Sequence, residues 1–310
     1  MMELQIQKPS HRRITTSPPG RGWKPRQDVT VNTEYVRKLL EENRLTERDE
    51  TLLRYLDNLP ILSSRQIKRL LWPDTSPSNM HRRLRQLFEY HLVDRVRMLS
   101  KEEGITYTLG KAGRIWLHGE ARGTPAPVVN VNTLAHDLAI AEVLVLLTEE
   151  LRQATPNTLL KLRLEWLSEA RARIVHKDKV LLEPDGLIRI WANQEYRAYL
   201  LEVDMGTERK AAFEAKVKRY QRAFQKTGLQ DEYGTTPSIF VATTTLQRAK
   251  GLAEIIAGQF EPQRKTNLLW WATTVSDMTK KGVYNGATGY AARNGQVTGP
   301  GILRRPWVES

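Results

Sequence analysis

Residues 183–204 read EPDGLIRIWANQEYRAYLLEVD and predict two adjacent strands with acidic side chains at one end. Two hydrophobic segments in this stretch flank a polar turn that is short enough for antiparallel pairing. Asp185 starts the first strand, and Glu202 and Asp204 end the second, two residues apart and therefore on one face. We expect the three carboxylates to meet at one end of a sheet, an arrangement that suits Mg²⁺ or Mn²⁺. A cation held there would activate water for phosphodiester cleavage.

The segments around this hairpin predict a mixed central sheet with flanking helices. In chain order we expect a helix over 133–153, strands over 159–166, 186–191 and 198–203, a helix over 208–226, a strand over 238–243, a helix over 246–259 and a strand over 267–273. Strands and helices that alternate in this way pack as layers around one core.

The preceding part of the chain predicts three helices followed by a hairpin, which is the order of a winged helix. Thr46 and Asp49 have the spacing of a helix cap, and leucines at helical spacing follow them. The expected helices cover 46–59, 63–71 and 76–91, the strands cover 94–98 and 105–109, and a short closing helix covers 110–117.

The third of these helices has the composition of a DNA-reading helix. Its apolar face contrasts with an opposite face rich in Arg, Asn and Gln, side chains that pair with base edges and phosphates in the major groove. The candidate DNA-binding residues are Ser78, Asn79, Arg82, Arg83, Arg85 and Gln86, with Arg95 and Arg97 from the hairpin. The alternative is the solvated face of an ordinary core helix.

Composition narrows the class of partner. The 310 residues include 48 Lys and Arg against 35 Asp and Glu, a net charge of +13, which favours nucleic acid. The chain has no cysteine, which excludes disulfides, thiolate zinc sites and cysteine nucleophiles. No apolar run approaches the roughly 20 residues of a membrane helix. We therefore expect a cytoplasmic protein that binds double-stranded DNA and no membrane.

The acidic hairpin resembles the PD-(D/E)xK nuclease superfamily through Pro184-Asp185 and Glu202-Val203-Asp204. Asp204 stands where that family usually has lysine. Some members supply the lysine from the next helix, for which Lys216 is the first candidate and Lys210 the second. The family's first helix often carries a glutamate, a place that Glu142 fits, unless it is only a buried acid paired with an arginine. The resemblance implies catalytic roles for Asp185, Glu202, Asp204, Lys216 and Glu142.

The order of motifs also resembles the replication-relaxation family of plasmid, phage and integrative-element proteins, over about residues 46–273. The motifs are Gln66, Arg83-Leu84, Tyr107-Thr108-Leu109, Gly113, His136-Asp137-Leu138, Glu183-Pro184-Asp185-Gly186, Leu201 to Glu208, and Lys216 to Tyr220. The resemblance implies a role in replication, or in nicking and relaxation during transfer, with replication or conjugation proteins and a second copy of the chain as possible partners.

The predicted fold class is α+β, an N-terminal winged helix-turn-helix followed by an α/β PD-(D/E)xK nuclease-like domain with a mixed central sheet. The expected parts are a basic flexible tail (1–45), the winged-helix DNA-binding domain (46–120), a linker (121–132), the nuclease-like domain (133–275) and a flexible C-terminal tail (276–310).

Several functions remain open at this point. The chain is either a DNA-binding protein that nicks DNA with Mg²⁺ or Mn²⁺, or a catalytically inactive replication accessory protein or transcriptional regulator. A protein-interaction scaffold with incidental basic charge is a further alternative. A relaxase with Tyr220 or Tyr233 as nucleophile is less well supported, because the sequence shows no histidine triad to hold its metal.

Overall fold

The computed structural model describes residues 30–97, 104–119, 133–155, 160–176, 179–227, 229, 233–260, 268–284 and 288–302. The chain divides into two compact units, residues 1–134 and residues 135–310. The predicted linker over 121–132 lies outside the described residues.

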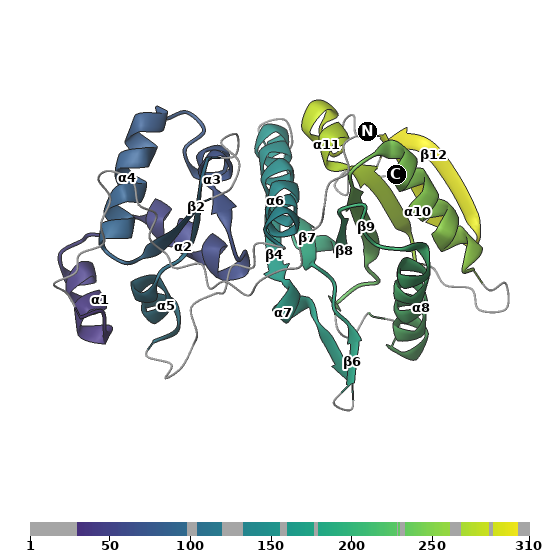
Figure 1. Cartoon of the computed structure of the whole chain (residues 1–310), viewed down its shortest axis with the longest axis horizontal. Helices are drawn as coiled ribbons and strands as arrows, with labels where there is room; N and C mark the ends of the chain where they lie inside the picture. The colour runs from purple at the N-terminus through teal and green to yellow at the C-terminus, as the bar shows by residue number, and fades with distance from the viewer. Residues whose placement is uncertain are drawn as a thin grey trace, which may run out of the picture. The chain divides into compact units, whose positions relative to one another are not determined.

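The N-terminal unit combines helices with one small antiparallel sheet (Figure 1). Its elements are α1 (Thr33–Glu41), α2 (Glu47–Asn58), β1 (Leu62–Ser63), α3 (Ser64–Leu71), α4 (Pro77–Glu89), β2 (Val93–Arg97), β3 (Ile105–Leu109) and α5 (Lys111–His118). The strands lie in the order β1-β3-β2, and both pairings are antiparallel. Helices and a hairpin therefore stand where the sequence predicted them between residues 46 and 120.

Local hydrogen bonds explain where α2 and α3 begin. Thr46 and Asp49 form a capping box on α2, because each side chain accepts the backbone N–H of the other residue. Ser63 and Gln66 form a second capping box on α3. Such caps satisfy N–H groups that lack a partner within the helix, and each stabilises by about 1 kcal/mol.

The C-terminal unit begins within α6 (Leu134–Ala154) and is built on one mixed sheet. Its other elements are β4 (Leu162–Ser168), α7 (Glu169–Ala172), β5 (Ile174–His176), β6 (Lys179–Leu182), β7 (Gly186–Ala192), β8 (Glu195–Asp204), α8 (Lys210–Thr227), β9 (Ser238–Thr243), α10 (Leu246–Gly258), β10 (Trp270–Thr274), α11 (Val275–Lys281), β11 (Thr288–Arg293) and β12 (Gln296–Ile302). Within the described residues the sheet order is β12-β11-β10-β9-β8-β7-β4. Strands β8, β9 and β10 are parallel and the remaining neighbours antiparallel, so the predicted mixed sheet is confirmed.

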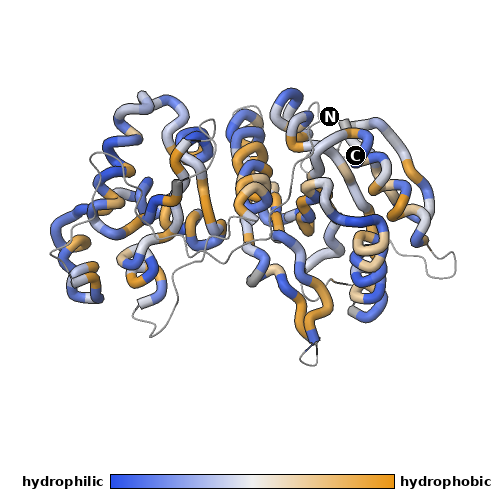
Figure 2. The backbone as a smooth tube through the Cα atoms, viewed as in Figure 1, coloured by the Kyte–Doolittle hydropathy of each residue, from blue (hydrophilic) through white to orange (hydrophobic). Residues whose placement is uncertain are grey.

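Helices cover both faces of this sheet. Phe213 and Val217 of α8 and Leu252 of α10 pack in one core with Leu200 and Val241 of the sheet. Helix α6 lies on the opposite face, and its middle is largely hydrophobic (Figures 1 and 2). None of the helices in the described parts of the chain has the length and apolar character needed to cross a membrane.

The structure differs from the prediction in the supposed N-terminal tail. Residues 33–41 form α1, whose Val36 and Leu39 are buried, and Asn32 caps the helix by accepting the N–H of Tyr35. Helix α1 packs against α5, the last helix of the same unit in chain order. The proline-rich composition of the preceding residues concealed this short amphipathic segment.

The supposed C-terminal tail also contains regular structure. Helix α11 follows β10, and strands β11 and β12 extend the sheet beyond β10. Their glycines satisfy a steric requirement, since a Cβ on Gly289 would lie 2.5 Å from the carbonyl oxygen of Ala272 on the neighbouring strand. Gly299 has φ of +129° and would meet the carbonyl oxygen of Gly289 at the same distance. The glycines here therefore indicate close packing between neighbouring strands and not a flexible tail.

Candidate functional site

The sheet brings two of the three predicted acids, Asp185 and Glu202, close together at one end. Gly186 at the start of β7 pairs with Leu201 near the end of β8. The backbone N–H of Asp185 donates to the carbonyl oxygen of Leu201 at 3.0 Å, which fixes the loop before β7 beside Glu202. Helix α8 follows β8 and returns along it, so that Lys216 reaches the same end of the sheet.

Glu202 is almost completely buried, with 3% of the residue exposed. The ammonium group of Lys216 lies 2.8 Å from its Oε2, and the hydroxyl of Tyr220 donates to its Oε1 at 2.5 Å. Burial raises the pKa of Glu202 to about 7; Lys216 opposes this shift and Asp185 adds to it. Glu202 is therefore poised between its neutral and ionised forms near neutral pH.

Lys216 bridges two acidic side chains. Its Nζ lies 2.8 Å from Glu202 Oε2 and 3.3 Å from Oε2 of Glu208, which precedes α8. Burial acts to lower the pKa of Lys216, but the carboxylates of Glu202, Glu208 and Asp185 outweigh it and raise the pKa, so the amine stays protonated. Lys210, the second candidate, is exposed and lies 3.9 Å from Glu214 instead.

Asp185 is held by α6 as well as by the sheet. Its Oδ2 accepts the backbone N–H of Val203 at 2.7 Å and lies 3.3 Å from Nε2 of His136. Hydrogen bonds to Asp137 and Asp185 raise the pKa of His136 to about 10 against the opposing effect of burial. His136 is therefore an imidazolium at neutral pH, and it places a positive charge beside Asp185.

Asp204 belongs to a different set of contacts. Arg248 of α10 donates to both of its carboxylate oxygens, at 2.8 and 3.1 Å, and Thr243 donates at 2.8 Å. Burial acts to raise the pKa of Asp204, but these hydrogen bonds prevail and lower it. Arg248 also donates to the carbonyl oxygen of Glu208 at 2.7 Å. Because Arg248 binds both Asp204 and the backbone of Glu208, it fixes the loop in which Glu208 lies. This loop position allows Glu208 to contact Lys216.

The predicted metal site at Asp185, Glu202 and Asp204 is not formed in this arrangement. In the described parts of the chain, no group of three or more His, Asp or Glu side chains is placed to hold a metal ion. Both oxygens of Glu202 accept hydrogen bonds from Lys216 and Tyr220, and both oxygens of Asp204 accept from Arg248. The donor set therefore does not fit Mg²⁺ or Mn²⁺ as it stands.

Glu142 follows His136 by six residues on α6 and is half-buried. At 3.6 residues per turn the two side chains leave the helix about 120° apart. His136 is therefore the side chain of α6 that reaches Asp185, and a role for Glu142 stays a prediction.

Helix α4 of the N-terminal unit presents the candidate DNA-binding face. Its apolar side chains Met80, Leu84, Leu87 and Phe88 are buried. Ser78, Asn79, Arg82 and Arg85 are exposed on the other side. Arg82 donates to Asn79 at 3.2 Å, and Arg85 pairs with Glu89 at 2.9 Å, both in contact with solvent.

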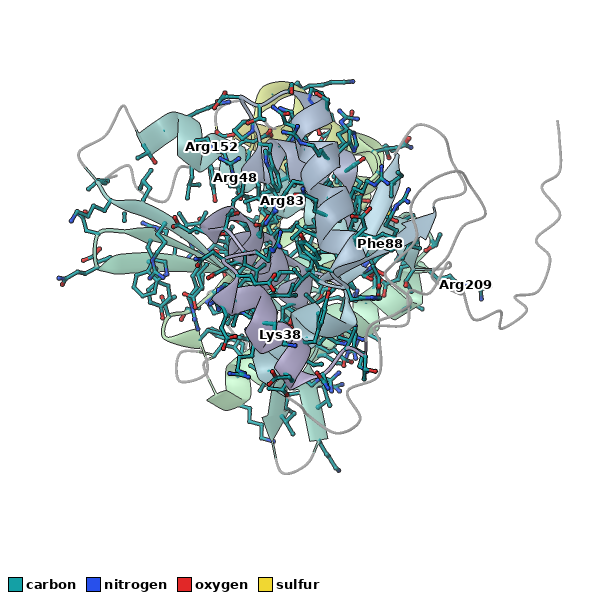
Figure 3. All side chains as sticks on the ribbon, turned by 90° about the vertical axis from the view of Figure 1, so that its left-hand side faces the viewer. Lys38, Arg48, Arg83, Phe88, Arg152 and Arg209 are labelled. Carbon is teal, nitrogen blue, oxygen red and sulfur yellow. The ribbon has the colours of Figure 1, made fainter. Side chains whose placement is uncertain are left out.

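The other two predicted DNA-binding residues of α4, Arg83 and Gln86, are half-buried. Arg83 of α4, which is labelled in Figure 3, donates from its Nε to the fully buried carboxylate of Asp49 on α2 at 3.0 Å. Its other nitrogens donate to the carbonyl oxygen of Arg44 at 2.7 Å and to Oε1 of Gln86 at 2.9 Å. These contacts leave Ser78, Asn79, Arg82 and Arg85 as the exposed set on α4.

The hairpin arginines differ in what the structure shows of them. The guanidinium of Arg95 lies over the ring of Phe88, 5.7 Å from its centroid, and burial lowers its pKa. Arg95 thus packs within the unit. The side chain of Arg97 is outside the described part of the chain.

Comparison with known proteins identifies one family. The family model described as replication-relaxation matches residues 53–239, which run from within α2 of the first unit to the start of β9 in the second. Searches of curated proteins and of solved structures gave no match.

Proposed function

The chain belongs to the replication-relaxation family, and we propose that it binds duplex DNA in the replication or relaxation of a plasmid or another mobile element. In this proposal the N-terminal unit is a winged helix and α4 is its reading helix. The exposed face of α4 carries the argument, because it offers side chains that pair with bases and phosphates next to a hairpin. The net charge of +13 supports the same partner.

The exposed pairs on α4 are easily exchanged for DNA. A solvent-exposed ion pair such as Arg85 with Glu89 contributes only about 0–1 kcal/mol, so a phosphate group can replace Glu89 at little cost. Asn79 has the chemistry to pair with an adenine edge, and Arg82 with a guanine edge or a phosphate. The role of each side chain within this face is part of the proposal.

The test is binding of labelled duplex DNA as a function of salt concentration. Removing one arginine that contacts a phosphate should reduce the salt slope by about 1, so the variant Arg82→Ala/Arg85→Ala should lower the slope by about 2. The matched control is Lys218→Ala/Arg219→Ala, which removes two exposed charges from α8 in the other unit. Binding without salt dependence, or an equal loss of affinity in both variants, would refute the proposal.

A second candidate function is phosphodiester cleavage by the C-terminal unit as a PD-(D/E)xK-like nuclease. One observation favours it: Asp185, Glu202 and Lys216, the residues that the nuclease resemblance implies, interact at one end of the sheet. The internal hydrogen bonds of Glu202 and Asp204 favour the opposite view, a catalytically inactive accessory protein or transcriptional regulator.

A nicking assay on supercoiled plasmid with Mg²⁺ or Mn²⁺ separates these two views. Nicked product that disappears in Asp185→Ala would support cleavage. Absence of any cation-dependent product from the intact chain would support the inactive accessory protein. Dependence on Mg²⁺ or Mn²⁺ stays a prediction until then.

A further inference from the structure

Lys216 occupies the centre of the acidic cluster. Its ammonium group contacts Glu202 from β8 at 2.8 Å and Glu208 from the β8–α8 loop at 3.3 Å. Asp185 adds a further attractive charge from the adjoining strand. One protonated amine thus contacts two carboxylates from separate segments and is attracted by a third.

The burial of Glu202 explains why a positive charge is needed here. The side chain of Glu202 is 4% exposed, and an isolated carboxylate with so little contact with water is strongly disfavoured. Lys216 is the cation that touches it, and the side chain of Lys216 retains 22% exposure toward solvent. The chain therefore supplies its own counter-charge where the nuclease resemblance implies a metal ion.

We propose that Lys216 is the resident counter-cation of this cluster and that a divalent cation binds there only when its ammonium group is removed or displaced. The role differs from that of a lysine that acts beside a bound metal ion. In this arrangement the amine and the metal ion compete for the same carboxylate oxygens.

The remaining contacts keep the carboxylates in place when the amine is removed. Tyr220 still donates to Glu202, and Arg248 still holds the backbone of the loop at Glu208. Asp185 keeps the backbone hydrogen bond from Val203. Removing Lys216 would thus leave Glu202 and Glu208 without the amine that contacts both of them, and carboxylate oxygens of this kind suit Mn²⁺.

The test is a titration of the full chain with Mn²⁺ in the absence of DNA. Calorimetry measures the affinity, and thermal denaturation measures the midpoint of unfolding at each Mn²⁺ concentration. Lys216→Met keeps most of the aliphatic stem and removes the charge. We expect this variant to bind one Mn²⁺ at least about tenfold more tightly than the unaltered chain, a difference of about 1.4 kcal/mol. Its midpoint should rise with Mn²⁺ while that of the unaltered chain does not.

Two further variants make the result specific. Lys218→Met removes an exposed charge two residues away on α8 and should behave as the unaltered chain. Glu202→Gln/Lys216→Met should not show the increased affinity, because the buried ligand is then neutral. If Lys216→Met is poorly folded, Mn²⁺ should restore its folding, and Lys216→Gln provides a milder replacement for the same titration.

Three results would overturn the proposal. They are equal Mn²⁺ affinity in the unaltered chain and in Lys216→Met, no binding by either Lys216 variant, and an increase in affinity that survives Glu202→Gln. Since no DNA is present, each result is independent of whether α4 binds DNA.

Discussion

On α4 the side chains of Arg82 and Arg85 are exposed to water, whereas the acidic side chains at the end of β8 are buried and paired with basic ones. The side chain of Arg85 is 49% exposed, and those of Glu202 and Asp204 are 4% and 3% exposed. An exposed ion pair is readily exchanged for a ligand. A buried pair must first give up hydrogen bonds that nothing else replaces. The proposed DNA contact on α4 therefore requires little change in the first unit, whereas the carboxylates of the second unit can bind a ligand only after their present hydrogen bonds are broken.

The largest expected effect tests whether that contrast also holds within α4. Arg83 differs from its neighbour Arg82 because it pairs with the fully buried Asp49. Arg83→Met should lower the free energy of unfolding of the first unit by about 3 to 5 kcal/mol, since it leaves a buried carboxylate without its partner. Urea denaturation of the full chain measures this decrease.

The matched control is Arg82→Met, one residue away on the exposed face. A surface substitution of this kind should change the stability by no more than about 0.5 kcal/mol. Equal changes in stability in the two variants would show that Arg83 contributes no more to stability than the exposed Arg82 does.

The next effect concerns the buried acid of the second unit. Glu202 has a pKa of about 7 in the folded chain, against an ordinary value of 4.5. The folded state therefore retains a proton that the unfolded state has lost, so this residue's contribution to stability is complete below pH 4.5 and disappears as the pH rises through 7. Relative to Glu202→Gln, the unaltered chain should lose on the order of 3 kcal/mol across this range.

Denaturation of both chains at several pH values measures that difference. Only its pH dependence is diagnostic, because Glu202→Gln also removes the ion pair with Lys216. A constant difference between pH 4.5 and 7 would mean that Glu202 titrates as an exposed glutamate does.

His136 carries a positive charge, and its contribution to stability should be lost over a higher pH range than that of Glu202. Its pKa is raised from 6.5 to about 10, so the stabilisation by its imidazolium is complete below pH 6.5 and is lost as the pH approaches 10. The side chain is 30% exposed, and with solvent screening we expect a contribution on the order of 2 kcal/mol. His136→Asn should therefore be less stable than the unaltered chain near neutral pH and equal to it near pH 10.

A direct measurement accompanies this comparison. The imidazole proton resonance that disappears in His136→Asn should titrate well above the ordinary value of 6.5 in the unaltered chain. A midpoint near 6.5 would show that Asp185 does not hold a positive charge beside it.

Much of this fold could be predicted because its elements carry local signals. Two hydrophobic segments around a short polar turn predicted β7 and β8, and the Thr46 cap predicted α2. In both places interactions between residues close in sequence determine the structure. Strands β11 and β12 could not be recognised, because their glycines are required by the neighbouring strand, a contact distant in sequence. The β5–β6 hairpin was missed because its strands are only three and four residues long.

The sequence predicted which residues form the site better than it predicted which of them interact with one another. The positions of Asp185 and Glu202 on adjacent strands predicted that both lie at one end of the sheet. Lys216 and Tyr220 are one helical turn apart on α8, and both contact Glu202. Arg248 and His136 determine how the acids are neutralised, yet they come from other helices, and no local pattern links them to β8. The sequence shows which charges are present, while the fold determines which of them meet.

The smallest expected effect tests the open face itself. Arg82→Ala should weaken binding to all duplex sequences by about 1 kcal/mol if it contacts a phosphate, and should weaken one sequence by about 1 to 3 kcal/mol if it contacts a base. Asn79→Ala is the natural companion, since its side chain accepts from Arg82 at 3.2 Å. Titration of several labelled duplexes at fixed salt distinguishes the two cases. Unchanged affinity in both variants would place the DNA contact elsewhere and leave α4 as the solvated side of a core helix.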